Sequence, residues 1–164
     1  MERSVQTIQL LEASLREQGL ETALDDSLPG CPGMCVLIPL PDDGIQLRTE
    51  LHYVSCGELF DVLQLYTTIA DALTDHDMRE LGQAVNVWNF SVFLGALAVR
   101  EDHRTLYHRY SLALAKELSA EQCAVVSESV LTSILQSIAP VQADILTLLS
   151  GITFEQLQQL PDRP

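Results

Sequence analysis

Apolar and polar residues alternate strictly between positions 45 and 53. One face of this segment carries Ile45, Leu47, Thr49, Leu51 and Tyr53, and the other carries Gln46, Arg48, Glu50 and His52. A period of two places successive side chains on opposite faces of a β-strand. The alternation therefore predicts a strand with one face toward the core and one toward water. The preceding Pro41–Gly44 predicts a tight hairpin turn from an apolar strand over 34–40.

Residues 5–18 have the spacing of an amphipathic helix instead. One apolar stripe holds Val5, Ile8, Leu11 and Leu15. Gly19 follows where a helix usually ends, because glycine accepts the left-handed backbone found at helix C-termini. Turn residues dominate 21–33, and a short strand is expected near Glu21–Leu24.

The segment 58–70 fits two patterns. Several of its apolar residues have helical spacing, whereas its β-branched and aromatic residues favour a strand. Gly57, directly before it, is typical of a hairpin turn after the preceding strand. We predict a strand here, with a helix as the alternative.

The middle of the chain predicts a helix followed by two strands. The helix is capped by Thr74 or Asp75 and runs to about Asn89. The strands are predicted over 90–99 and 106–114, with a polar turn between them.

The last third of the chain is predicted to be helical. Ser119 and Gln122 have the spacing of a capping box, so a helix is expected to begin there and to reach Ala139. Pro140 is expected to kink the helix or to restart it as a separate C-terminal helix over 141–159.

Together these patterns predict an α+β fold in which an antiparallel sheet packs with helices. The order of elements is α-β-β-β-α-β-β-α plus a C-terminal helix. A chain of 164 residues, 47% of them apolar, is expected to form a single α+β domain over residues 1–164.

The formal net charge is −14, with a single lysine. Such a surface repels the phosphates of nucleic acids and anionic lipid, so we expect no nucleic acid and no membrane as a partner. The sequence contains no run of about 18 apolar residues, so no membrane helix is predicted. The first residues also lack the layout of a secretory signal. We therefore expect a cytoplasmic protein whose acidity provides solubility, with a docking surface for basic partners as the alternative.

The helix after Ser119 is poor in charge, since no basic residue lies between Lys116 and Arg163. Such a helix is expected to be covered on more than one side, by the sheet, by the last helix or by a second subunit. We therefore predict a homodimer. The predicted protein-binding or dimer surface comprises Leu47, Leu51 and Tyr53 on the sheet and Val126, Val130 and Ile134 on the helix.

Short motifs in the second half resemble those of YbjN-type proteins and of class I type III secretion chaperones. They are Asn86 and Asn89, the strand Gly95–Val99, the acidic turn Glu101-Asp102 and the opening Leu118–Glu121. The resemblance covers about residues 5–138 in the order of elements, and the C-terminal helix lies outside it.

The resemblance implies a cytoplasmic, non-catalytic homodimer. Secretion chaperones bind an extended, unfolded-like segment of a secreted protein along sheet and helix surfaces, whereas YbjN-type proteins are linked to regulation. The first hypothesis is thus a chaperone-like protein-binding accessory, and the alternative is a YbjN-type regulatory or stress-related protein. Fold analogy by itself does not fix function.

Three residues near the end of the middle helix are expected to have structural roles. Trp88, the sole tryptophan, would anchor a core or an interface and needs a partner for its indole N–H. Asn86 and Asn89 are three residues apart and share a helix face. They are expected to cap the helix end or to bond the start of the next strand.

The sequence contains no catalytic or phosphate-binding motif, so we expect no enzyme activity, cofactor or metal. The cysteines lack a zinc-type pair and are expected to be reduced and mostly buried, with a redox pair of Cys31 and Cys35 as the alternative. Cys123 lies near a helix start, which lowers a thiol pKa, although its neighbours indicate a small packing position. A small-ligand or enzymatic domain using Cys123 or the histidines is the third hypothesis. The histidines are His52, His76, His103 and His108.

Overall fold

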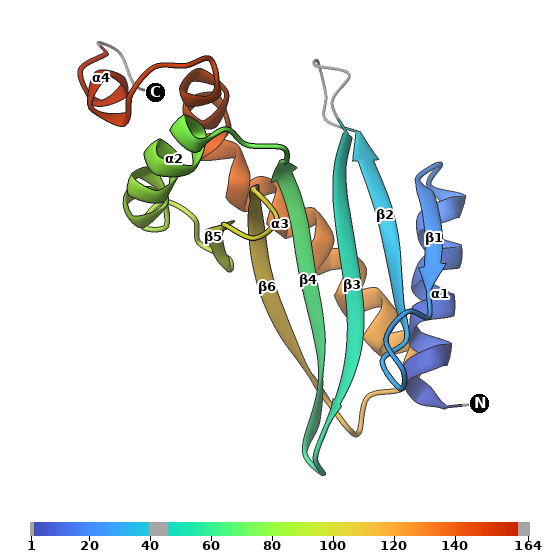
Figure 1. Cartoon of the computed structure of the whole chain (residues 1–164). Helices are drawn as coiled ribbons and strands as arrows, with labels where there is room; N and C mark the ends of the chain where they lie inside the picture. The colour runs from blue at the N-terminus through green and yellow to red at the C-terminus, as the bar shows by residue number, and fades with distance from the viewer. Residues whose placement is uncertain (1, 40–45, 161–164) are drawn as a thin grey trace. The chain divides into compact units, whose positions relative to one another are not determined.

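The sheet has six antiparallel strands in the order β1-β2-β3-β4-β6-β5 (Figure 1). The computed structural model describes residues 2–39 and 46–160. In chain order the elements of this part are α1 (Arg3–Glu17), β1 (Glu21–Asp25), β2 (Gly33–Pro39), β3 (Gln46–Cys56), β4 (Phe60–Ala70), α2 (Asp75–Trp88), β5 (Ala96–Arg100), β6 (Thr105–Ala115), α3 (Ala120–Leu149) and α4 (Phe154–Gln158). The predicted α+β class is confirmed.

The chain divides into two compact units. Unit 1 comprises Met1–Thr67 and Arg109–Ser133, and unit 2 comprises Thr68–His108 and Ile134–Pro164. Strands β4 and β6 and helix α3 contribute residues to both units. The prediction of a single domain stays a prediction.

The alternation predicted for β3 is present in unit 1. Leu47, Thr49, Leu51 and Tyr53 are buried. β3 pairs antiparallel with β2, and β2 pairs antiparallel with β1, so that Cys35 lies between Ala23 and Glu50 in the register. The predicted turn at Pro41–Gly44 lies outside the described residues.

Helix α1 packs on the first three strands of unit 1. Its buried face includes the predicted Ile8, Leu11 and Leu15, whereas Val5 is half-buried. The helix ends before Gly19, whose φ of 84° is in the left-handed region, as predicted. The side chains of Ser14 and Gln18 donate to the Glu128 carboxylate at 2.7 and 2.6 Å, which joins α1 to the first part of α3.

Two predictions about the first strands are confirmed, and they change the order of elements. Residues 60–70 form strand β4, after a turn in which Gly57 has a φ of 63°. Residues 21–25 form β1, so four strands rather than three precede α2. The strand reading of 58–70 was correct because buried residues alternate along β4.

Two boundaries in the second half were predicted wrongly. The strand predicted over 90–99 begins only at Ala96. Helix α3 is continuous through Pro140 to Leu149, and the separate C-terminal helix is only Phe154–Gln158. Pro140 and Gln136, four residues before it, are both exposed, so water can satisfy the carbonyl that proline leaves without a donor. The capping box at Ser119 and Gln122 is confirmed by both of its hydrogen bonds.

Unit 2 has a core of its own. Its buried members are Leu73, Leu81, Ala84, Val85, Trp88, Val92, Leu97, Leu106, Val141, Ile145, Leu148, Phe154 and Leu157. Thr74 forms the predicted cap of α2, with a reciprocal pair of bonds to Asp77. The buried Glu80 carboxylate accepts a hydrogen bond from the Phe154 backbone N–H at 2.9 Å, which fixes the start of α4 against α2.

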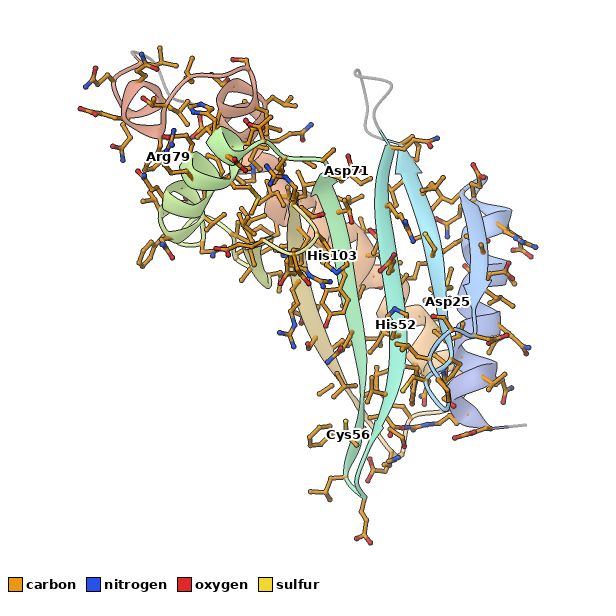
Figure 2. The ribbon with its side chains drawn as sticks, viewed as in Figure 1. Asp25, His52, Cys56, Asp71, Arg79 and His103 are labelled. Atoms are coloured by element: carbon orange, nitrogen blue, oxygen red, sulfur yellow. The ribbon has the colours of Figure 1, made fainter. Side chains whose placement is uncertain are left out.

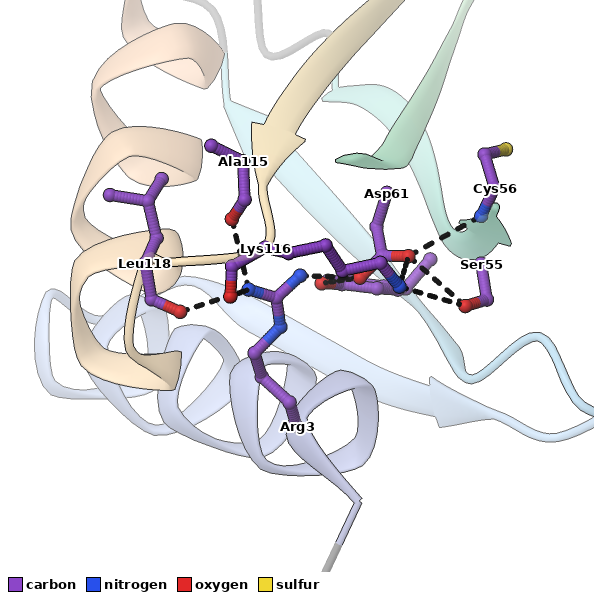
Figure 3. A network of polar contacts seen from close by, with 8 residues as sticks. Arg3, Ser55, Cys56, Asp61, Ala115, Lys116 and Leu118 are labelled. Carbon is purple, nitrogen blue, oxygen red and sulfur yellow. Dashed lines mark hydrogen bonds and ion pairs between the residues drawn. The ribbon is translucent and has the colours of Figure 1, made fainter. Parts of the chain in front are cut away.

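A buried carboxylate, Asp61, holds unit 1 together at the β3–β4 hairpin (Figure 3). It forms ion pairs with Arg3 of α1 and with Lys116, which follows β6, the latter at 2.5 Å. It also accepts hydrogen bonds from the Tyr53 hydroxyl at 2.8 Å and the Ser55 hydroxyl at 3.0 Å. Burial alone raises the pKa of Asp61, but the bonds from Lys116, Arg3, Tyr53 and Ser55 outweigh it and hold the pKa well below its ordinary value.

Replacing Asp61 by asparagine is expected to lower the free energy of unfolding at pH 7 by about 2–4 kcal/mol, because two cations lose their buried partner. The folded pKa is depressed, so this stability is present above the ordinary aspartate pKa of 3.8 and is lost as the pH falls below it. Urea unfolding between pH 7 and 2.5 measures both effects. The variant should show less loss of stability below pH 4 than the wild type.

The matched control is Asp102→Asn, which removes an exposed carboxylate paired with Arg100. Its unfolding free energy at pH 7 should stay close to that of the wild type, because solvent screens an exposed ion pair. Equal effects of the two substitutions would show that Asp61 has no special role in stability.

Candidate protein-binding surface

Unit 2 exposes two phenylalanines directly after helix α2. The side chains of Phe90 and Phe93 are 94% and 65% exposed, and Val87 on the last turn of α2 is 46% exposed. Large apolar side chains gathered on a surface mark interaction sites, whereas scattered single ones are ordinary. We call residues Asn89–Gly95 the phenylalanine loop.

The loop has a defined backbone although its aromatic rings are exposed. The amides of Ser91 and Val92 donate to the Trp88 carbonyl at 2.8 and 3.1 Å, and the Val92 side chain is buried. The Asn89 side chain accepts from the Leu97 N–H at 2.7 Å and donates to the Leu97 carbonyl at 3.0 Å. The loop is therefore fixed by main-chain and amide bonds, and its rings are presented without a large ordering cost on binding.

Leu94 attaches the loop to the interior of unit 2. Its N–H donates to the Ser137 hydroxyl at 2.9 Å, and that hydroxyl is 3.3 Å from the Leu94 carbonyl. The same carbonyl accepts a bond from Nε2 of His108. Ser137 and His108 are both fully buried, so they hold the loop from inside.

His108 is a neutral anchor. Burial lowers its pKa, and the hydrogen bond to the Leu94 carbonyl opposes this only in part. Its Nδ1 is buried and has no hydrogen-bond partner in the described residues. A protonated ring would place a second N–H there without an acceptor. The neutral form with a proton on Nε2 therefore fits this position.

Stability is expected to fall as the pH drops from 7.5 to 5.5. The folded pKa of His108 is lowered, so the unfolded chain takes up the proton first, at the ordinary histidine pKa of 6.5. The pKa values of the unit 2 acids Asp77, Glu80 and Asp102 are also lowered, so these carboxyls titrate below this window. His108→Gln keeps a donor for Leu94 and should reduce this pH dependence in urea unfolding.

His103→Gln is the control, because the His103 side chain is exposed and forms a surface ion pair with the exposed Asp102. It should keep the full dependence of the wild type. An unchanged dependence in His108→Gln would assign the effect to another group.

A groove lies beside the loop, between α2 and β5. Its volume is about 670 Å³, and it is lined by Asp75, Met78, Arg79, Gly82, Val85, Asn86, Asn89, Leu97, Ala98, Val99, Glu101 and Arg104. A Cβ atom added at Gly82 would meet no atom of the described residues within 4 Å. The helix therefore has open space at this wall.

The loop and most of this groove are free of charge in a strongly acidic chain. No charged residue occurs between Leu81 and Val99. Among the charged lining residues, Arg104 pairs with Asp75 at 2.8 Å, and Arg79 pairs with Glu80 at 3.0 Å. The acidic residues that give the chain its net charge of −14 lie outside this stretch, so this surface is close to neutral.

Most of the surface predicted from the sequence is buried. Leu47, Leu51 and Tyr53 are core residues of unit 1, and Ile134 is buried in unit 2. The alternation of β3 correctly identified a buried face, so these side chains are unavailable to a partner in this conformation. Val126 is exposed and Val130 half-buried, next to the exposed Val125. This part of α3 is a second exposed apolar surface.

The predicted structural residues have mixed outcomes. Asn89 bonds the start of the next strand, as predicted. Asn86 instead donates to the Gly82 carbonyl at 3.4 Å, within its own helix. Trp88 is a buried anchor that meets Phe154 edge-on, with ring centroids 6.4 Å apart. Its indole N–H has no hydrogen-bond partner in the described residues, contrary to the expectation of one.

The thiols and histidines of the described residues do not gather into a metal-binding cluster. All four cysteines are free, and burial raises the pKa of Cys123, opposite to the lowering expected from its helix position. Within residues 2–39 and 46–160, no three metal-binding side chains come together. A second hollow near Cys35 is lined by Asp25, Arg48, Glu50 and His52; Asp25 and His52 lie on β1 and β3 (Figure 2). Arg48 and Glu50 neutralise each other there at 2.6 Å.

Helix α3 is long and apolar enough to cross a membrane by composition alone. An 18-residue window has a mean hydropathy of 1.4, and 39% of it is buried. The helix contains no unbroken run of about 18 apolar residues. The polar residues that interrupt its apolar ones are mostly uncharged serine, threonine and glutamine, so the mean hydropathy of the window stays high. One such helix is weak evidence, since buried core helices meet the same criterion.

No protein-family model matches this sequence, and no curated protein or solved structure is significantly similar to it. The resemblance to secretion chaperones and YbjN-type proteins therefore stays a prediction. The candidate surface stands on its geometry alone.

Proposed function

We propose that the protein is a non-catalytic protein-binding accessory, similar to type III secretion chaperones, and that it works as a homodimer. The observation that carries the proposal is the display of Phe90 and Phe93 on a loop held by buried bonds. Aromatic side chains of this kind are frequent anchors at protein interfaces.

The arrangement has no evident purpose within the isolated chain. Phe90 is almost fully exposed, so its ring contributes little to the stability of unit 2. Three bonds to Leu94 and two to Leu97 nevertheless order the backbone that carries it. A surface that is apolar and ordered before binding supports recognition of another protein.

Contacts between side chains and a groove are favoured over the addition of a strand. The edge strand β5 has five residues, and the Asn89 side chain occupies both main-chain groups of Leu97. A strand added at this edge would have to displace that amide. The exposed Val125 and Val126 on α3 provide a further surface, which suits an extended apolar segment of a partner.

The alternative, a YbjN-type regulatory or stress-related protein, would use the same binding surfaces with a different partner. An enzymatic role has less support, because the Cys123 thiol is buried and its pKa is raised. This thiol is poorly suited to act as a nucleophile.

Capture from a native extract tests the binding role, with the immobilised full chain as bait and quantitative mass spectrometry as readout. Replacing Phe90 and Phe93 by serine should reduce recovery of the specific partner at least tenfold, since each interface anchor contributes about 1–2 kcal/mol or more. The partner is then purified, and its affinity for both proteins is measured directly.

Leu59→Ser is the matched control, because Leu59 is also highly exposed but lies in the β3–β4 turn of unit 1. It should bind like the wild type. Partners retained equally by the wild type and the double variant would remove the phenylalanine loop from the binding surface.

A further inference from the structure

Strand β6 is longer than β5, its neighbour toward the edge of the sheet. It has eleven residues and lies between β4, which also has eleven, and β5, which has five. Because the turn 101–104 joins β5 to β6, β5 pairs with the first part of β6. Within the described residues, the second part, Tyr110–Ala115, therefore has a neighbouring strand on one side only. We call Tyr110–Ala115 the open half of β6, and it belongs to unit 1.

The alternation of main-chain bonds shows which groups face the open side. The N–H of Lys116, directly after the strand, donates to the Leu59 carbonyl at 3.2 Å, so the main chain of Lys116 points toward the β4 side. In an antiparallel pair, the N–H and C=O of one residue point to the same side, and those of the next residue point to the other. The main-chain groups of Ala115, Ala113 and Ser111 therefore point away from β4.

Side chains occupy the main-chain groups at the two edge strands of the sheet. On β5, the Asn89 amide bonds both main-chain groups of Leu97. On β1, the Arg16 guanidinium donates to the Thr22 carbonyl at 3.4 Å and to the Thr22 hydroxyl at 2.9 Å. Contacts of this kind hinder the addition of a further strand.

The open half of β6 has such a contact only at its end, within the described residues. Arg3 donates to the Ala115 carbonyl at 2.9 Å, whereas no side chain of the described residues bonds the main chain of Ser111 or Ala113. The side chains of Ser111, Ala113 and Ala115 are small and exposed, so they leave the edge accessible. An accessible edge of this kind can pair with an extended segment of another protein.

The core layer beside the open half is also incomplete. Leu51 of β3 and Leu65 of β4 are fully buried, and so is Leu114 of β6. Tyr110 and Leu112 share the face of Leu114 by the alternation of the strand, but they are only half-buried. An added strand would place alternate side chains beside Tyr110 and Leu112, and apolar side chains there would complete their burial.

The residues at the ends of the open half favour a foreign strand over a second copy. Arg109 precedes this segment and Lys116 follows it. Two copies paired antiparallel through it would bring these two basic residues close together, and like charges across strands are destabilising. A foreign strand can instead carry an acidic residue opposite Ser111, which is diagonal to the exposed Arg109 and within reach of its long side chain.

We propose that an extended segment of the foreign partner adds to the open half of β6 as a further antiparallel strand. Its apolar residues alternate with polar ones, so that the apolar side chains cover Tyr110 and Leu112 and an acidic side chain pairs with Arg109. This inference rests on the proposed function and names how the chain of the partner is bound. It needs no contribution from the phenylalanine loop.

Amide hydrogen exchange of the full chain, followed residue by residue by NMR, tests whether the edge is open. The N–H groups of Ser111 and Ala113 should exchange about tenfold faster or more than those of Tyr110 and Leu112, which point toward β4. Protection of Ser111 and Ala113 in the dilute free protein would overturn the proposal. Protection that appears only as the protein concentration rises would assign the edge to a second copy and would also overturn it.

A synthetic peptide then serves as the probe for strand addition. It is the capped hexapeptide acetyl-Ser-Val-Ser-Val-Glu-Val-amide, whose valines would lie opposite Tyr110, Leu112 and Leu114. At saturation it should slow the exchange of Ser111 and Ala113 by about tenfold or more, because each amide gains a main-chain acceptor. No change in the exchange of these two amides would contradict the proposal.

The matched control is the same peptide with N-methyl groups on its second serine and its glutamate. These are the residues whose N–H groups would donate to β6, so the control keeps every side chain and loses the main-chain donors. It should leave the exchange of Ser111 and Ala113 unchanged. Equal slowing by both peptides would show that side-chain contacts alone cause the protection, which would rule out an added strand.

Ala113→Pro tests the same contact from the protein side. It removes an N–H that points to the open side, so the ladder between β6 and β4 keeps its bonds. The variant should bind the unmodified peptide about tenfold more weakly or less, whereas Ala113→Val keeps the N–H and should bind like the wild type. The amide spectrum of the remaining residues verifies that both variants fold. Unchanged affinity in a folded Ala113→Pro protein would refute the role of this edge.

The two proposals fail in different ways. A partner captured through Phe90 and Phe93 that leaves the exchange of Ser111 and Ala113 unchanged would refute strand addition and leave the binding function intact. Protection of these amides by the peptide, with no protein captured by the full chain, would support strand addition and refute the accessory role.

Discussion

The fold of unit 1 depends on the compensation of one buried negative charge by protein groups. Burying Asp61 is unfavourable unless its charge is compensated, and the compensation comes from Arg3 near the N-terminus and from Lys116 after β6. Tyr53, Ser55 and the main-chain N–H of Cys56 on β3 donate further hydrogen bonds to it. Arg3 also donates to the main-chain carbonyls of residues 115, 116 and 118. The first helix, the β3–β4 hairpin and the exit from β6 are therefore specified together, because none of them can leave without exposing an unpaired buried charge.

Unit 2 solves a different problem, which is to keep an irregular segment ordered. Main-chain groups away from helices and strands need partners when they are withdrawn from water. Here the partners are the side chains of Asn89, His108 and Ser137, each bonded to Leu94 or Leu97. Polar side chains thus supply the main-chain hydrogen bonds that a neighbouring strand would supply, while the Phe90 and Phe93 side chains of the same segment remain exposed to solvent. The order of the loop and the exposure of its rings have the same origin.

Local patterns in the sequence were sufficient for much of the fold. The alternation along β3, the stop at Gly19 and the caps at Thr74 and Ser119 depend on neighbouring residues, and the structure confirms each of them. The late start of β5 was not predicted, because the mostly apolar residues 90–94 suggest a strand, while their backbone is held by distant groups such as Ser137. The exposure of Phe90 had one local signal, the turn-forming residues Asn89, Ser91 and Gly95. Burial of β3 positions was read as a binding surface because periodicity identifies a shared face but not what covers it.

The amide of Asn89 makes the two main-chain bonds at Leu97 that a neighbouring strand would make, and this protects the edge of the sheet against aggregation. An unpaired edge strand next to exposed phenylalanines would favour the addition of strands from other chains and the growth of fibrils. The Asn89 amide occupies this edge, so it blocks the addition of a further strand at Leu97. The exposed phenylalanines can then contact a partner without promoting cross-β assembly.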